Sequence, residues 1–204
     1  MIQLPTLQNL LINIAAAFVI VTAKEFTKAL VSTKLGDTRP KRDKRLTLNP
    51  LKHIEIVGMI FIVLLGFGWG KPLETSSLHY KNRKRDILIT HIVPSVVIVV
   101  LGMAAFFVLN NILPAVQTPI QLHLFLGRIG ILGVSLALFN MIPIHPMDGA
   151  KILSMFLRPN QVVRMAGMDK AMLFILIVIL LVWPGNPISF VISALTTFLL
   201  GLVV

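Results

Sequence analysis

Residues 24–28 read Lys24-Glu25-Phe26-Thr27-Lys28 and lie in the last third of an apolar run over residues 7–32. Side chains four residues apart share one face of a helix, so both ammonium groups are expected on the same side, with Glu25 beside them. Ionisable side chains inside a membrane-length helix are costly and are functional candidates by default. The pentapeptide therefore indicates a membrane helix that carries a polar site.

The composition is that of a membrane protein. The 204-residue chain is 56% hydrophobic and only 13% charged, with a mean hydropathy of +0.87. Soluble domains carry about 25% charged residues. The absence of cysteine excludes disulfides and thiolate metal sites. We expect one polytopic domain over residues 1–204, embedded in the lipid bilayer.

The net charge of +11 is concentrated between the apolar runs, at residues 34–45, 71–85 and 151–170. This is the positive-inside pattern, and it argues against nucleic acid as a partner. It predicts an integral protein of a bacterial cytoplasmic membrane, with the basic loops in the cytosol and the N-terminus outside. The first apolar run lacks a preceding basic region and is interpreted as a retained helix, not a cleaved signal peptide.

The hydropathy pattern predicts an all-α polytopic membrane protein with about five to six transmembrane helices. The run at 54–69 is short, contains three glycines and lies between two basic loops, so a full crossing would put one of those loops outside. It predicts a re-entrant or broken segment near 54–70. An amphipathic stretch is expected at 149–157. The expected membrane segments cover residues 7–32, 87–109, 122–141, 172–182 and 188–203.

Three further motifs follow the pentapeptide along the chain: Asn49-Pro50-Leu51-Lys52-His53-Ile54, Gly68-Trp69-Gly70-Lys71-Pro72, and Met147-Asp148-Gly149 after Phe139-Asn140. In this order they resemble the compact bacterial branch of the site-2 protease family, the intramembrane zinc metalloproteases. The resemblance extends over residues 7–158 and implies a site-2 protease core.

The resemblance also implies roles for four residues. In the family, a His-Glu-x-x-His helix supplies two zinc ligands and the general base, and an aspartate supplies the third ligand. By position, the ligands correspond to Lys24, Lys28 and Asp148, and the base to Glu25. A protonated lysine has no acceptor and cannot ligate a metal. The family's Ala-Gly-Pro-x-x-Asn stretch is altered as well, to residues 92–97 around Pro94, and two separate losses favour a natural pseudoenzyme.

Two lysines carry the same +2 charge as a zinc ion. We therefore predict an ion cluster in which Lys24 and Lys28 meet Asp148, and also Glu25, with nitrogen–oxygen distances within about 4 Å. The alternative is a pair of snorkelling lysines that reach the headgroups from a helix end.

Other candidates belong to the same predicted cleft. His53 is expected to hold its loop by hydrogen bonds, whereas His145 can point into the cleft. A rebuilt metal site formed by these histidines with Asp148 and Glu25 is the less favoured interpretation. His91 lies inside an apolar run and is either functional or hydrogen-bonded near a helix end. Pro94 is expected to kink its helix. Trp69 and Lys71 are expected in an edge strand able to pair with an extended peptide.

Together these patterns predict a catalytically inactive, site-2-protease-like protein without a cofactor. It would act as a binding, regulatory or structural subunit for a membrane protein or transmembrane peptide. One alternative is a divergent zinc protease with Glu25 as base and Asp148 as a ligand. A second alternative is a transporter or channel component, although the sequence shows no internal repeat of the kind that transporters often carry.

Overall fold

A computed structural model describes residues 6–183 and 187–203, and all regular structure in these residues is helical. The all-α class predicted from the sequence is therefore confirmed. Four segments are long and apolar enough to cross a membrane: α1 (Leu7–Lys34), the run Arg83–Ala115, α5 (Ile120–Asn140) and α7 (Pro159–Val182). The remaining elements are α2 (Arg39–Arg42), η1 (Pro50–Lys52), α3 (Ile56–Leu65), α4 (Arg83–Phe107), η2 (Val108–Ile112), η3 (Leu113–Ala115), α6 (Asp148–Ser154) and α8 (Pro187–Gly201).

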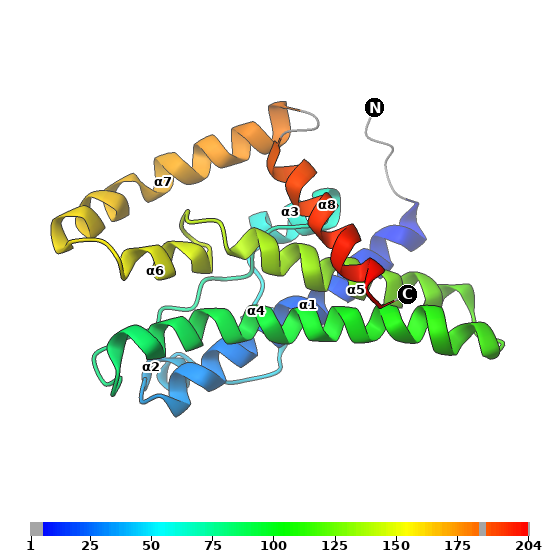
Figure 1. Cartoon of the computed structure of the whole chain (residues 1–204), viewed down its shortest axis with the longest axis horizontal. Coiled ribbons are helices and arrows are strands. Elements are labelled where there is room, and N and C mark those ends of the chain that lie inside the picture. Colours follow the sequence, from blue (N-terminus) through cyan, green and yellow to red (C-terminus); the bar gives the residue numbers. More distant parts are fainter. Residues whose placement is uncertain (1–5, 184–186, 204) are drawn as a thin grey trace.

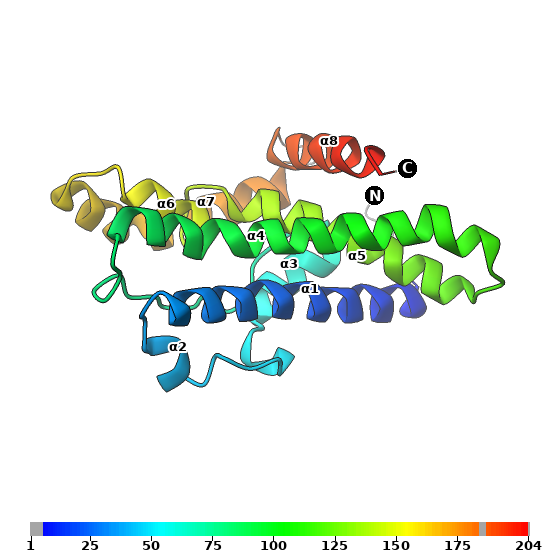
Figure 2. The ribbon, with the colours of Figure 1, turned by 60° about the horizontal axis from the view of Figure 1, so that its bottom comes forward.

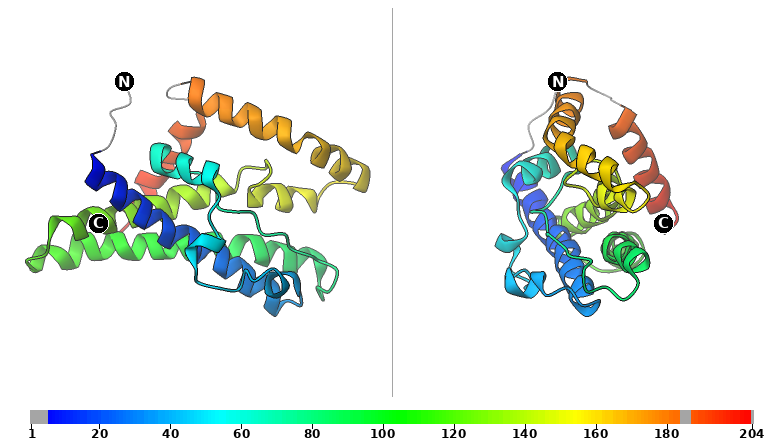
Figure 3. Two further views of the ribbon diagram at one scale, coloured as in Figure 1. Left: turned by 180° about the vertical axis from the view of Figure 1, so that it is seen from behind. Right: turned by 90° about the vertical axis from the view of Figure 1, so that its left-hand side faces the viewer.

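Three long helices, α1, α4 and α5, lie side by side and form the body of the molecule (Figures 1 and 2). The C-terminal ends of α1 and α5 and the N-terminal end of α4 lie at the same end of this bundle. The basic connections that follow α1 and α5 and precede α4 therefore lie at one end of the bundle. Helices that cross a bilayer in alternating directions require this arrangement. Figure 3 shows α7 lying apart from the bundle, with α8 folded back toward it.

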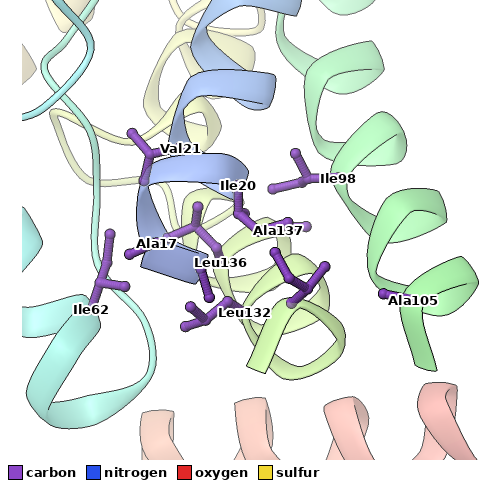
Figure 4. Packing of buried hydrophobic residues seen from close by; sticks show 11 residues of the cluster. Ala17, Ile20, Val21, Ile62, Ile98, Ala105, Leu132, Leu136 and Ala137 are labelled. Atoms are coloured by element: carbon purple, nitrogen blue, oxygen red, sulfur yellow. The ribbon is translucent and has the colours of Figure 1, made fainter. Parts of the chain in front are cut away.

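The bundle is held by small and branched apolar side chains. Ile20, Ile98 and Leu136 are almost completely buried and come from α1, α4 and α5 respectively. Figure 4 shows the side chains of this cluster where the three helices meet. Because these positions recur on one face of each helix, the long apolar runs interlock along a common core.

Glycines bring α4 and α5 into close backbone contact. A Cβ added to Gly102 would lie 2.9 Å from the carbonyl oxygen of Gly130, and one added to Gly133 would lie 2.9 Å from the Cα of Gly102. Small residues at such crossings let helix backbones approach closely in a membrane. The crossing therefore depends on the absence of side chains at these positions.

The short segment predicted to be re-entrant contains a helix of only ten residues, α3. At 1.5 Å per residue it extends about 15 Å, half the hydrocarbon thickness of a bilayer. The helix ends at Gly66, whose φ of 84° places it in the left-handed region, where its N–H donates to the carbonyl of Ile62 (3.0 Å). The segment is thus a short helix followed by non-helical chain, not one helix as far as Trp69.

The C-terminal part differs from the sequence prediction. The sequence predicted a loop up to residue 170 and a helix from residue 172, but α7 begins at Pro159. Pro159 occupies the first helical turn, where its missing N–H costs nothing, and the N–H of Arg158 donates to the side chain of Gln161 (2.8 Å). The polar residues before position 172 lie on an exposed helical surface, which hydropathy alone counted as loop.

A second apolar cluster connects α7 and α8 to the rest. Leu176 and Leu180 of α7 pack with Phe61, Trp69 and Phe139. The rings of Phe67 and Phe139 stack with centroids 5.0 Å apart, and those of Trp69 and Phe139 with centroids 6.3 Å apart. The non-helical chain after α3 is therefore buried against α3, α5 and α7.

Candidate functional site

Five ionisable side chains from three helices meet inside the bundle, and we call them the ion cluster: Lys24, Glu25 and Lys28 of α1, His91 of α4 and Asp148 of α6. The ammonium of Lys24 lies 2.8 Å from Asp148 Oδ2 and that of Lys28 lies 2.5 Å from Asp148 Oδ1. Lys24 also donates to Glu25 Oε1 (2.9 Å), and Lys28 lies 3.7 Å from Glu25 Oε2. The predicted distances between the two lysines and Asp148 are confirmed.

The ion cluster is closed to solvent. Lys24, Glu25 and Asp148 are each 2% exposed and Lys28 is 4% exposed. Snorkelling toward headgroups would leave the ammonium groups exposed, so the structure contradicts that alternative. Two ammonium and two carboxylate groups cancel in charge, which is how a low-dielectric interior can hold them. Removing one partner would leave an uncompensated buried charge.

Asp148 holds its place because α6 begins there. A Cβ on the next residue, Gly149, would collide with the backbone carbonyl of Met141, so only glycine lets the start of α6 pack against the end of α5. Met147, just before, is 1% exposed. Fixed on both sides, the Asp148 carboxylate points to α1 and α4.

His91 completes the ion cluster from the third helix. Its Nδ1 lies 2.8 Å from Asp148 Oδ1, the oxygen that also faces Lys28. A carboxylate only accepts, so Nδ1 is the donor. The sequence singled out His91 because it interrupts an apolar run, and its contact with Asp148 explains how that run accommodates it.

The other sequence candidates lie elsewhere. His53 is buried and its Nε2 donates to the carbonyl of Thr47 (2.6 Å), as expected for a residue that holds its loop. Burial lowers the pKa of His53 below its ordinary value, despite that hydrogen bond. His145 lies beside Asp169 of α7, with Nδ1 3.9 Å from Oδ2, instead of pointing toward Asp148. Pro94 is buried within α4, which runs unbroken from Arg83 to Phe107.

The predicted edge strand is absent from the described residues. Trp69 is buried, and its Nε1 donates to Glu55. The N–H of Lys71 donates to the carbonyl of His53 (2.7 Å), while its side chain is exposed. The prediction is wrong because this stretch is packed between α3 and α5, and the amide of Asn140 donates to the carbonyl of Gly68 (3.2 Å).

Sequence reasoning missed a hydrogen-bond network that adjoins the ion cluster, which we call the hydroxyl network: Ser32, Asp37, Tyr80 and Thr90. Ser32 Oγ donates to Asp37 Oδ2 (2.8 Å), and Tyr80 Oη lies 2.9 Å from Ser32 Oγ and 3.1 Å from Thr90 Oγ1. Burial raises the pKa of Tyr80 above its ordinary value. Ser32 follows Lys28 by one turn and Thr90 precedes His91, so the network covers the loop-side end of the cluster.

The donor set limits the chemistry of the ion cluster. An ammonium nitrogen has no free lone pair, and both oxygens of Asp148 already face ammonium groups. Across the ranges 6–183 and 187–203, no group of three or more His, Cys, Asp or Glu side chains is placed to hold a metal ion. The arrangement is suited to joining three helices by charge.

Together, the long apolar helices and the buried ionic contacts define a polytopic membrane protein with a polar centre. The sequence is 32% identical over 146 residues to the protein described as putative zinc metalloprotease YwhC of Bacillus subtilis (strain 168). The match covers 68% of this chain and 66% of that protein, just under two thirds of its length. No family model and no solved structure matches the chain. The chain is therefore homologous to that protein.

Proposed function

We propose that this protein is a site-2-protease-like membrane protein without zinc-dependent proteolytic activity, which serves a membrane partner as a binding, regulatory or structural subunit. The observation that carries the proposal is the pair of ionic contacts from Lys24 and Lys28 to Asp148, at 2.8 and 2.5 Å. On the family's pattern, these three residues stand at the positions of the zinc ligands. Two ammonium groups then supply the positive charge that a metal would supply.

The residues do not fit a catalytic zinc. Catalytic zinc sites use three protein ligands and leave one position for water. Of the three residues at these positions, only Asp148 has atoms that can ligate zinc. Both of its carboxylate oxygens already contact a lysine ammonium group. We therefore derive no reaction step through a metal.

Glu25 is in no position to act as a general base. Its Oε1 accepts from Lys24 at 2.9 Å, and its side chain is 3% exposed. A base that activates water needs the water within hydrogen-bond reach, about 2.6–3.2 Å. The pairing and burial of Glu25 support the view that its role is now to balance charge.

Zinc content tests this proposal directly. The purified wild-type chain is expected to hold no stoichiometric zinc, whereas the double variant Lys24→His/Lys28→His, which restores the family's ligand set beside Asp148, is expected to hold about one per chain. The variant serves as the positive control that purification does not strip metal. Stoichiometric zinc in the wild type, together with cleavage of a membrane-reconstituted substrate that Glu25→Gln abolishes, would refute the proposal and favour a divergent protease.

Orientation is part of the proposal and can be tested with the same chain. We place the basic loops in the cytosol and the N-terminus outside, in a bacterial cytoplasmic membrane. Because the sequence contains no cysteine, single cysteines introduced at exposed positions give an unambiguous signal. Lys41→Cys is expected to resist a membrane-impermeant thiol reagent in intact cells, and Gln117→Cys is expected to react.

A further inference from the structure

The chain from α2 to η1 forms an exposed surface on the outside of the bundle. Five side chains define it, and we call them the α2–η1 surface: Lys41, Arg42, Lys44, Leu48 and Leu51. Figure 2 shows α2 and the loop after it on the side of α1 opposite α4. All five side chains are exposed, the two leucines to 66% and 74%. Basic groups and large apolar groups therefore follow one another on one short stretch of chain.

The positive charge of this surface faces outward. Arg42 lies 3.0 Å from Asp43 in an exposed contact, whereas Lys41 and Lys44 make no ion pair within the described residues. Asp37, the other carboxylate of this region, is 1% exposed and accepts hydrogen bonds from Ser32 and from two backbone N–H groups. It is therefore enclosed, and the surface keeps an excess of positive charge.

Lys44 occupies its position against the preference of the backbone. Its φ of 52° lies in the left-handed region, and within the described chain no other residue except glycine has a positive φ. The N–H of Lys44 donates to the carbonyl of Lys41 (3.1 Å) and that of Arg45 to the carbonyl of Pro40 (2.8 Å), the pattern of a helix end that favours glycine. A lysine costs free energy here that glycine would not. A side chain kept at a strained position indicates that it has a use.

The apolar part of the surface is anchored from its inner side. Arg45 is 7% exposed and donates to the carbonyls of Lys71 (2.7 Å) and Pro72 (3.2 Å). His53 is fully buried, and its ring donates to the carbonyl of Thr47 (2.6 Å). The two leucines lie between these anchors in the sequence and project outward from a stretch that is fixed to the rest of the fold.

The basic and apolar parts lie at different depths along α1. The helix α2 begins five residues after the end of α1 at Lys34. The apolar part ends at His53, deeper in the bundle: a Cβ added to Gly70 would lie 2.8 Å from the carbonyl oxygen of His53 and 3.3 Å from Cγ of Glu25. Glu25 precedes Lys34 by nine residues, or about 14 Å of helix. The chain thus leads from the end of a membrane helix toward the membrane interior.

The exposed face of α3 continues the apolar part of the surface. Ile56, Ile60 and Leu64 are exposed and follow one another at intervals of four, so they share one face of α3. An apolar helix face in a membrane segment is suited to contact with lipid acyl chains. Leu48 and Leu51 therefore precede a face with the same character.

We propose that the α2–η1 surface binds an anionic phospholipid, with its phosphate at the three basic side chains and an acyl chain along the two leucines. A phospholipid carries its charge at the membrane boundary and its apolar part deeper, which is the order of the complementary groups here. An acidic peptide would match the basic groups but not the leucines, and an apolar helix the reverse. The site depends neither on loss of proteolysis nor on which side of the membrane the basic loops lie.

The experiment uses the full chain with one fluorophore on Thr38→Cys, reconstituted in phosphatidylcholine liposomes. Thr38 is exposed and its side chain caps no helix, and the sequence contains no cysteine that would compete for the label. Phosphatidylglycerol or phosphatidylcholine with a nitroxide on the acyl chain near the headgroup is included in both leaflets. Quenching of the fluorophore measures the association of each lipid, and phosphatidylglycerol is expected to quench more strongly.

Lys44→Gly is the most informative variant, because it removes a charge and also relieves the left-handed backbone. The preference for phosphatidylglycerol is expected to fall about three- to fivefold, the effect of one basic residue near an anionic surface. Thermal unfolding is expected to be unchanged or shifted upward. Lys41→Gln should lower the preference similarly, and Leu48→Gln/Leu51→Gln should weaken quenching by both lipids.

The matched control is Lys84→Gln, which removes one positive charge at the exposed start of α4 and is expected to leave the preference unchanged. Equal losses in Lys84→Gln and Lys41→Gln would show that only net charge matters and would overturn the proposal. Equal quenching by the two lipids in the wild type would overturn it as well. So would quenching by neither lipid together with crosslinks between two copies through Thr38→Cys, since a second copy would then cover the surface.

Discussion

The ion cluster and the C-terminal helix α8 hold buried polar side chains under opposite conditions. In the cluster, Lys24 and Lys28 both reach Asp148 within 2.8 Å, and three helices close around them. On α8, the hydroxyl of Thr196 is also buried but has no hydrogen-bond partner within the described residues, and a Cβ added to Gly201 would meet no atom within 4 Å. The comparison teaches that paired charges hold the centre of the bundle together, whereas the C-terminal end of α8 is left open.

The largest predicted effect is on the ion cluster. Asp148→Asn removes the charge that both lysines face and is expected to lower the free energy of unfolding by about 3–5 kcal/mol, the cost of leaving a buried charge unpaired. Equilibrium unfolding in detergent micelles measures it. The control is Asp169→Asn, at a carboxylate that is 25% exposed and lies 3.9 Å from His145. A similar small loss in both variants would mean that the cluster is not closed.

The second prediction compares the two helix faces that carry small residues. Gly133→Val would force a side chain against the carbonyl of Ile98 and the backbone of Gly102, and is expected to cost about 1–3 kcal/mol. Gly201→Val faces open space and is expected to change stability by less than about 0.5 kcal/mol. Thermal unfolding of both variants tests the difference. An equal loss would show that the face of α8 is already packed.

A smaller effect is expected at the hydroxyl network. Tyr80→Phe removes the oxygen that lies within 3.1 Å of both Ser32 and Thr90 and should cost about 1 kcal/mol. Hydrogen exchange at the end of α1 is expected to increase, since the network joins α1 to α4. Ser154→Ala, which removes an exposed hydroxyl bonded only within α6, is the control. Unchanged hydrogen exchange near Ser32 would show that the hydroxyl network does not hold the end of α1 against α4.

The smallest effect concerns pH. Because burial lowers the pKa of His53, the unfolded chain binds a proton more readily than the folded one. The contribution of His53 to stability is therefore complete above the ordinary histidine pKa of about 6.5 and is lost as the pH falls through the lower folded value. His53→Gln should flatten this part of the pH–stability curve, and His79→Gln, at an exposed site, should not. A steeper pH–stability curve in His53→Gln would contradict the lowered pKa of His53.

Much of the fold could be predicted because hydropathy determines where membrane helices run. Residues 7–32, 87–109 and 122–141 correspond to α1, α4 and α5 within a few positions. The start of α7 was missed because its first half is polar, and helical structure there depends on the turn at Pro159. Hydropathy cannot distinguish a polar helix from a loop.

The contact of Asp148 with the two lysines could be predicted because charge requires a partner and the family resemblance supplied one. Tyr80 could not be found in the same way, since it lies in a loop without periodicity and its partners come from α1 and α4. The position of His145 beside Asp169 depends on where α7 packs. The open space beside Gly201 is a property of packing, because the sequence does not tell which small residues remain uncovered.

The position of Asp148 has a consequence for how the chain is assembled during synthesis. α1 is synthesised before α4 and α5, with two lysines and one glutamate in its second half, and the aspartate that balances them is made only after these helices. Until then, α1 carries an excess of positive charge, which favours the membrane surface over the interior. We therefore expect α1 to reach its final depth in the bilayer only after Asp148, at the start of α6, has been made.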